Sequence, residues 1–157
     1  NKKLSVKPTP SQPPFYIYKA ENVRSSYLRF PLREKLGRMV SFLLMVTAEL
    51  ENLTNFQPHG GPDDPSFFYA FKVKCERCGE LSQRETWLSL NETVPLPVGK
   101  GTVNLIQKCK FCERDGMITM IPGKGKPLTL EDSQAGNYVP LMRFDCRGYE
   151  PVDFIVR

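Results

Sequence analysis

The chain of 157 residues lacks most of the patterns that catalysis or membrane insertion requires. It has one histidine and one tryptophan, and its longest apolar run, Phe42 to Val46, is far too short to cross a membrane. No apolar segment near the start resembles a secretory signal. No nucleophile constellation, acid–base pair or cofactor fingerprint stands out. We therefore expect no enzyme activity.

An excess of one sign of charge is lacking outside the first part of the chain. Residues 1–38 hold nine basic and two acidic side chains, whereas residues 39–157 hold thirteen basic and fifteen acidic ones. The overall net charge of +5 therefore comes from a leader of +7, and the remainder carries −2. A body of this charge argues against a phosphate-backbone partner, so nucleic-acid binding is the weaker interpretation.

The cysteines are spaced in a pattern that is typical of metal ligands. Four of the five cysteines form two C-x-x-C pairs, separated by thirty residues: Cys75, Cys78, Cys109 and Cys112. Two intervening residues let the chain turn back, so that both sulfurs of a pair can face one ion. Two such pairs in one small chain supply the four thiolates of a tetrahedral site. The sequence predicts one structural Zn²⁺ at these four residues.

Other uses of paired cysteines fit less well. Two disulfides would need an oxidising compartment, and a thioredoxin-like redox pair needs a strand-to-helix setting that neither pair has. An iron–sulfur cluster is possible with four thiolates, but its usual spacings differ. The gap of thirty also exceeds the common zinc-ribbon gap of about 15–20 residues. It indicates two hairpin knuckles that a sheet brings together.

Basic residues flank both pairs. Lys74, Arg77, Lys108 and Lys110 lie beside or inside the knuckles, and Zn²⁺ with four thiolates has a formal charge of −2. These side chains can offset that charge and favour thiolate over thiol. They can equally be solvated residues at hairpin tips, and the two interpretations are compatible.

The leader and the body differ in composition. Residues 1–38 are basic and rich in proline, so we expect them to be disordered; an organelle-targeting role is a minor alternative. From Met39 onward, short apolar and β-branched segments alternate with Gly/Pro turns, and no long 3.6-residue period appears. This pattern predicts an all-β antiparallel sandwich or barrel over residues 39–157. Thr129 is expected to cap one short helical turn.

Two short internal matches indicate a fold of two similar halves. Phe71 to Cys78 resembles Leu105 to Cys112, and Leu50 to Phe56 more weakly resembles Gly148 to Phe154. In the first match, an apolar strand leads directly into a C-x-x-C knuckle. Both cysteine pairs are then expected where strands turn.

Four stretches together resemble one known family. They are Ala48 to Asn55, Lys74 to Glu80, Gln107 to Cys112 and Phe144 to Phe154. This combination is similar to the eukaryotic CXXC-motif-containing zinc-binding proteins, a family of unknown function, and Pro95 to Gly101 points to its plant branch. The resemblance covers Met39 to Phe154.

The resemblance carries several implications. It implies an all-β fold, one zinc held by Cys75, Cys78, Cys109 and Cys112, and a soluble intracellular protein without established catalysis. We expect a cytoplasmic monomer, with the nucleus as an additional location. Residues 1–38 have no counterpart in the family, and family members continue past Phe154, so residues 39–157 are expected to be C-terminally shortened.

The fifth cysteine and the single histidine are not expected to be metal ligands. Cys146, the fifth cysteine, is expected to be a buried free thiol that packs as a small hydrophobe; a redox or partner-binding role is the alternative. His59 lies in a Gly/Pro loop, and we do not expect it to be a ligand because four cysteines already complete a tetrahedron.

The last resembling stretch is also the most charged. It contains Asp145, Arg147, Glu150 and Asp153. We expect an arginine–carboxylate pair to clamp the turn here, with a partner-binding patch as the alternative.

The sequence thus predicts a non-enzymatic zinc-binding β-domain. Two alternatives stay open besides nucleic-acid binding. One is a protein-binding adaptor whose knuckles or outer sheet dock another protein. The other is a redox-responsive or metal-handling protein whose thiolates release zinc on oxidation.

Overall fold

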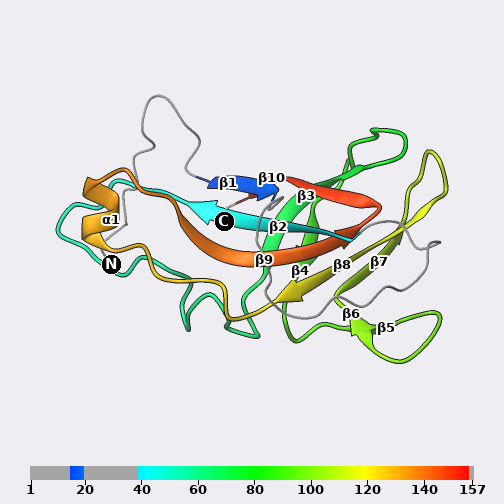
Figure 1. The fold of residues 1–157 in the computed structure, drawn as a ribbon, viewed down its shortest axis with the longest axis horizontal. Coiled ribbons are helices and arrows are strands. Elements are labelled where there is room, and N and C mark those ends of the chain that lie inside the picture. The colour runs from blue at the N-terminus through cyan, green and yellow to red at the C-terminus, as the bar shows by residue number, and fades with distance from the viewer. Residues whose placement is uncertain (1–14, 20–38, 156–157) are drawn as a thin grey trace, which may run out of the picture.

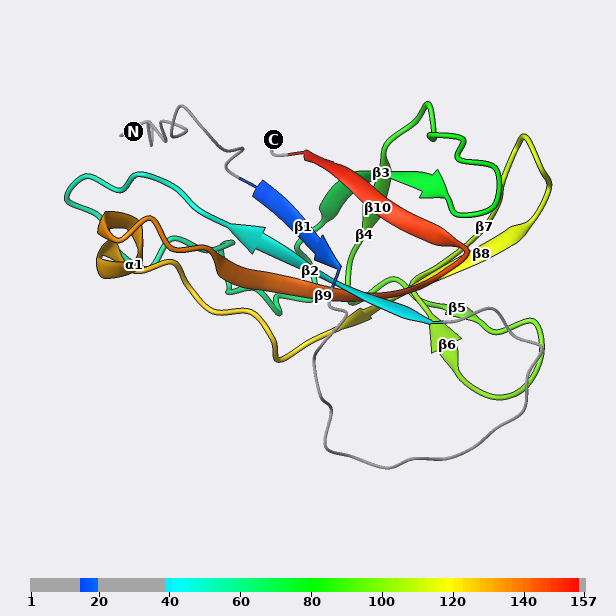
Figure 2. The same cartoon turned by 45° about the horizontal axis from the view of Figure 1, so that its top comes forward.

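The computed structural model describes residues 15–19 and 39–155, and these residues form a β-sandwich (Figures 1 and 2). Eleven elements follow one another along this part of the chain. They are β1 (Phe15–Lys19), β2 (Val40–Val46), β3 (Tyr69–Cys75), β4 (Thr86–Leu88), β5 (Val94–Pro95), β6 (Thr102–Val103), β7 (Leu105–Lys108), β8 (Asp115–Ile121), α1 (Leu130–Gln134), β9 (Val139–Arg147) and β10 (Tyr149–Ile155). The expected all-β antiparallel fold is confirmed.

Two antiparallel sheets make the layers. The larger sheet has the order β1-β2-β9-β8-β7, and the smaller has the order β10-β3-β4. A two-stranded ribbon of β5 and β6 lies beside them. β9 and β10 are joined by a tight turn at Gly148 but belong to different sheets. This hairpin therefore links the two layers at one end of the molecule.

Alternating side chains fill the space between the sheets. In β2, Phe42, Leu44 and Val46 are buried while the residues between them are half-buried, which is the period of two that a strand imposes. The Phe144 ring lies 5.1 Å from the Phe71 ring and 6.0 Å from the Tyr69 ring, so aromatic contacts cross from one sheet to the other.

A second, smaller core lies at the end of the molecule that carries α1. It consists of Val46, Ala48, Leu50, Leu128 and Val139. Thr129 is the N-cap of α1, and its hydroxyl accepts a hydrogen bond of 3.1 Å from the Asp132 N–H. The predicted short capped helix is therefore confirmed.

The structure describes one short segment of the leader that was expected to be disordered. Within residues 1–38, the five residues of β1 pair in antiparallel register with β2, from Phe15 opposite Val46 to Lys19 opposite Phe42. For these five residues the structure differs from the expected disorder, because their aromatic and β-branched sequence suits a strand. The rest of the predicted leader, and its proposed targeting role, lie outside the described residues.

The described residues include no helix long and apolar enough to cross a membrane.

Candidate metal centre

Each cysteine pair lies in a hairpin loop at the end of a strand. β3 ends at Cys75, and β7 ends at Lys108, immediately before Cys109. Both loops are closed by the residues that flank them: Lys74 is bridged to Leu81, and Lys108 pairs with Asp115. The loops therefore have the same length, and each presents its cysteines at the same positions.

The two loops also share a hydrogen-bond pattern. In the first, the Cys75 N–H donates to the Glu80 carbonyl and the Gly79 N–H donates to the Cys75 carbonyl, both at 2.9 Å. In the second, the Cys109 N–H donates to Arg114 and the Glu113 N–H donates to Cys109, again at 2.9 Å. The similarity of the two sequence segments thus reflects one knuckle conformation used twice.

One residue in each knuckle adopts the left-handed conformation that turns the chain back. It is Gly79 in the first knuckle, with a φ of 75°, and Glu113 in the second, with a φ of 59°. Glycine adopts this region freely, whereas a residue with a side chain is strained there. The second knuckle therefore holds its shape against a local cost that the first avoids.

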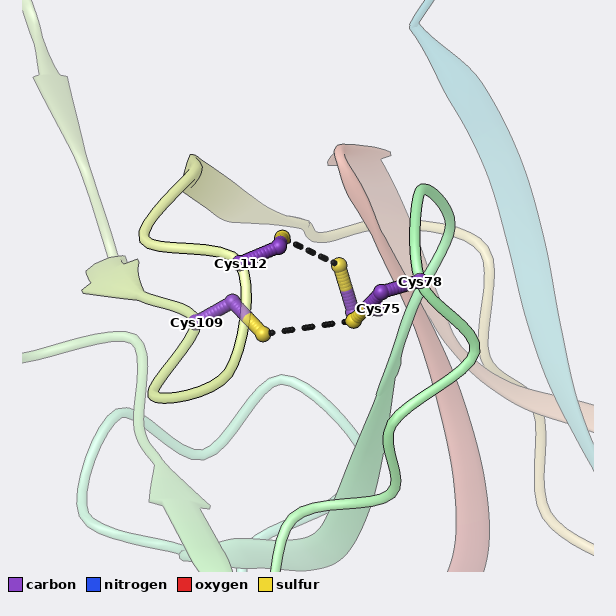
Figure 3. A group of neighbouring side chains, drawn as sticks. All are labelled: Cys75, Cys78, Cys109 and Cys112. Atoms are coloured by element: carbon purple, nitrogen blue, oxygen red, sulfur yellow. Dashed lines mark hydrogen bonds between the residues drawn. The ribbon is translucent and has the colours of Figure 1, made fainter.

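The fold brings the four predicted sulfurs together (Figure 3). The Sγ atoms of Cys75, Cys78, Cys109 and Cys112 all lie within 4.8 Å of one another. The Sγ–Sγ distance is 3.6 Å between Cys75 and Cys112, and 3.6 Å between Cys78 and Cys109. His59 is not part of this group.

These distances distinguish between the possible uses of the cysteines. A disulfide needs about 2.05 Å between sulfurs, and all five cysteines are free thiols. A tetrahedron of sulfurs around Zn²⁺, with Zn–S bonds of about 2.3 Å, has edges of about 3.8 Å. The close pairs match that edge, so the donor set fits one tetrahedral zinc ion.

Backbone N–H groups polarise the cluster. The N–H groups of Cys112 and Phe111 stabilise the Cys109 thiolate and lower the pKa of this thiol to about 7, although desolvation opposes them. The Glu80 N–H likewise favours the Cys78 thiolate, but desolvation and the neighbouring thiols raise the pKa of Cys78 to about 12. In the metal-free cluster, the Cys109 thiol therefore ionises more readily than the Cys78 thiol.

The β9–β10 hairpin packs against both knuckles. The Glu76 N–H in the first knuckle donates to the Gly148 carbonyl at 3.0 Å. A Cβ on Gly148 would lie 3.1 Å from the Asp115 carbonyl oxygen, just after the second knuckle. Gly148 has a φ of 79°, so both the conformation and the close approach require glycine here.

Tyr149 packs behind the cluster. It pairs with Cys75 across β10 and β3, and its ring lies so close to Gly116 that a Cβ there would come within 2.2 Å of it. Its hydroxyl is buried without a hydrogen-bond partner among the described residues. Burial, followed by the nearby Cys109, Cys75 and Cys112 charges, raises the pKa of Tyr149 to about 12. Sequence reasoning included Tyr149 in the resembling stretch Phe144 to Phe154 but gave it no role, because it lies far in sequence from both cysteine pairs.

Cys146 lies apart from the group. It is fully buried in β9, as expected for a thiol that packs as a small hydrophobe. Burial, and then the Asp145, Glu76 and Glu150 carboxylates, raises the pKa of this thiol well above its usual value.

The predicted arginine–carboxylate clamp involves a different arginine. Arg143, not Arg147, pairs with Asp145, through Nε–Oδ1 and Nη2–Oδ2 distances of 2.8 and 3.0 Å, and Ser41 joins them. Residues two apart on a strand lie on the same face, so Arg143 and Asp145 are neighbours on the surface of β9. Arg147 makes no ion pair with any described residue.

The fold and the cluster together define a class of protein: a β-sandwich domain with a four-cysteine metal centre built from two knuckles. A sequence profile described as "CXXC motif containing zinc binding protein, eukaryotic" matches residues 43–157. The chain belongs to this family of zinc-binding proteins, whose biochemical role is unknown.

Relatives and solved structures agree with this assignment. The "CXXC motif containing zinc binding protein" of Xenopus laevis is 39% identical over 116 residues, which cover 74% of this chain and 69% of the relative. The protein of the same name from Homo sapiens is 38% identical over the same shares. The crystal structure of C1orf123 superposes with a TM-score of 0.64 at 37% identity, covering 73% of this chain and 68% of that one.

A more distant structure shares the fold alone. It is a hypothetical protein from Plasmodium falciparum, with a TM-score of 0.60 at 18% identity, covering 75% of this chain and 70% of that one.

Proposed function

We propose that Cys75, Cys78, Cys109 and Cys112 hold one structural Zn²⁺, and that the domain is not an enzyme. The observation that carries the proposal is the cluster of four sulfurs within 4.8 Å. Four protein thiolates fill the coordination sphere of zinc, whereas a hydrolytic zinc site keeps a position open for water. The ion would join β3 of one sheet to β7 of the other.

Metal binding in such a site is coupled to folding. Structural zinc contributes about 10–16 kcal/mol of apparent binding free energy in zinc-finger peptides. The ion would join two knuckles that come from different sheets, and so would hold this end of the sandwich together.

The test is metal content and thiol titration on the purified protein. We expect one zinc per chain and four thiols that react only after chelation, with Cys146 reactive only after unfolding. The melting temperature should fall sharply when a chelator is added. Equal melting temperatures with and without chelator would contradict a structural role. Zinc loss at mild peroxide doses that reductant reverses would favour the redox-responsive alternative.

An exposed aromatic residue favours protein binding as a second function. Phe111, between the cysteines of the second knuckle, is 76% exposed. It borders a groove of about 440 Å³ that also includes the exposed Leu81. Exposed aromatic side chains beside a groove are typical of interaction sites.

This second function has a matched control. Val98 is 86% exposed in the β5–β6 loop and does not border the groove. A protein that is captured from a cell extract by the wild-type chain and by Val98→Ser, but not by Phe111→Ser, would support an adaptor role. Equal capture by both variants would contradict it.

A further inference from the structure

A second, smaller cavity lies beside the metal centre, between the two knuckles and the β9–β10 turn. Its volume is about 230 Å³, which leaves room for several water molecules at about 30 Å³ each. None of the four clustered cysteines lines it. Its lining residues are Glu76, Arg77, Arg114, Asp115, Arg147 and Gly148.

The three arginines of this cavity lack partners. Their guanidinium groups make no hydrogen bond or ion pair with any residue of the described part of the chain, where the ion pairs are Arg143–Asp145 and Lys126–Asp132. Each guanidinium has five N–H donors in a planar fork that suits the oxygens of carboxylate and phosphate groups. Three such forks around one small cavity form a donor-rich site.

The charges around the cavity indicate the size of the ligand. The arginines exceed the two carboxylates, Glu76 and Asp115, by one positive charge. An excess of one charge does not suit a polyanion such as nucleic acid. The negative formal charge of the zinc–thiolate centre can be offset by Lys74, Lys108 and Lys110, which do not line this cavity. The small excess in the cavity suits one compact anionic group that can accept hydrogen bonds from several guanidinium groups at once.

We propose that this cavity binds a single phosphoryl group, with Arg77, Arg114 and Arg147 as the hydrogen-bond donors. The proposal rests on the proposed structural zinc, because Arg77 lies in the first knuckle and Arg114 is the last residue of the second. The ion would fix the distance between these two arginines. Arg147 completes the site from the end of β9, which the Gly148 carbonyl ties to the first knuckle.

The experiment is an NMR titration of the zinc-loaded protein with inorganic phosphate at constant ionic strength, with chloride as the reference. A peptide with one phosphoserine, and the same peptide with serine, follow. We expect saturable shifts at the N–H groups of Glu76, Arg77, Asp115 and Gly148. If phosphate binds and the phosphopeptide does not, the ligand is the free ion; if the phosphopeptide binds and the serine peptide does not, it is a modified side chain.

Variants assign the binding to the cavity. Arg114→Gln and Arg147→Gln should each weaken phosphate binding about tenfold, the loss expected for one charge-assisted hydrogen bond. Lys110→Gln is the matched control, because Lys110 is a basic knuckle residue that does not line this cavity. It should bind phosphate as the wild type does.

Three results would overturn the proposal. They are shifts that grow linearly and equally with phosphate and chloride, equal affinities in the arginine variants and the wild type, and loss of zinc together with phosphate binding in those variants. The last would mean that the arginines serve only to offset the charge of the metal centre. Zinc-free protein that still binds phosphate would contradict the structural role of zinc while supporting the cavity, so the two failures are distinguishable.

Discussion

The two ends of this sandwich are closed by different means. At the α1 end, the Ser133 hydroxyl donates to the Ala48 carbonyl at 2.7 Å and accepts from the Leu50 N–H at 2.8 Å, and the smaller core packs beneath. At the cysteine end, by contrast, several polar side chains of the described residues have no hydrogen-bond or ion-pair partner. The Tyr149 hydroxyl and three arginine side chains find no partners among the described residues. Packing and hydrogen bonds close one end, whereas the other presents four clustered thiols that can hold a metal ion.

The largest effect should come from removing a sulfur. Cys75→Ser should abolish zinc binding, because three thiolates and a weakly binding hydroxyl no longer match the site. In hydrogen exchange, the amides of both knuckles should lose protection while those around α1 keep it.

Two controls sharpen this contrast between the ends. Cys146→Ala removes a thiol outside the cluster and should leave zinc content unchanged. Ser133→Ala should destabilise the α1 end by about 1–2 kcal/mol, since it leaves the Leu50 N–H unsatisfied, without changing zinc affinity. Uniform loss of protection in Cys75→Ser would show that the two ends unfold together.

The pH dependence of zinc affinity should also be large. Zinc binds thiolates, so its affinity falls as pH falls. The pKa of Cys109 is lowered to about 7 from an ordinary value of 9.0, so in the metal-free fold its thiolate is favoured above pH 7 and is lost as pH falls through 7. Calorimetry in buffers of different ionisation enthalpy should show several protons released per zinc at pH 7. An affinity that is constant between about pH 6 and about pH 8 would contradict thiolate ligation.

The two knuckles should respond in opposite directions to changes at their left-handed residue. Gly79→Ala should destabilise the zinc-loaded protein by about 1–2 kcal/mol, and only through conformation, since a Cβ there meets nothing within 4 Å. Glu113→Gly should stabilise it by up to about 1 kcal/mol, because relief of strain exceeds the added flexibility of the unfolded chain. Urea unfolding measures both. Changes of the same sign would show that the knuckles are not equivalent.

The smallest effect should come from the buried tyrosines. Tyr149→Phe removes a hydroxyl without a partner among the described residues and should be neutral or slightly stabilising. Tyr69→Phe removes a hydroxyl that donates to the Pro62 carbonyl at 2.6 Å and should cost about 1 kcal/mol. Thermal unfolding compares the two. A cost at Tyr149 that vanishes when zinc is removed would instead mean that its hydroxyl bonds to the loaded centre.

Local sequence patterns predicted much of this fold. The apolar and β-branched composition of β2 and the run that ends at Cys75 were sufficient to place strands, and Thr129 was sufficient to place the start of α1. The spacing of each C-x-x-C pair predicted a knuckle. These features depend on contacts between residues close in sequence, so periodicity and turn chemistry report them directly.

Sequence patterns did not predict which side chains or strands would pair with each other in the folded sheet. Arg143 and Arg147 both lie two residues from Asp145, on the same face of β9. Only the tertiary structure, in which Ser41 of β2 bonds to both Arg143 and Asp145, assigns Arg143 to this carboxylate. The pairing of β1 with β2 was also missed, because proline-rich flanks dominated the composition of its segment.

By itself, the sequence determined that this protein is an all-β domain with two cysteine knuckles, because strand period and loop spacing are properties of short segments. Only the tertiary structure decided that the knuckles meet. Their meeting depends on β3 and β7 lying in different sheets and on the β9–β10 hairpin linking those sheets at one end. The same arrangement gathers Arg77, Arg114 and Arg147 around one cavity, since residues so far apart in sequence become neighbours only through the packing of the two sheets.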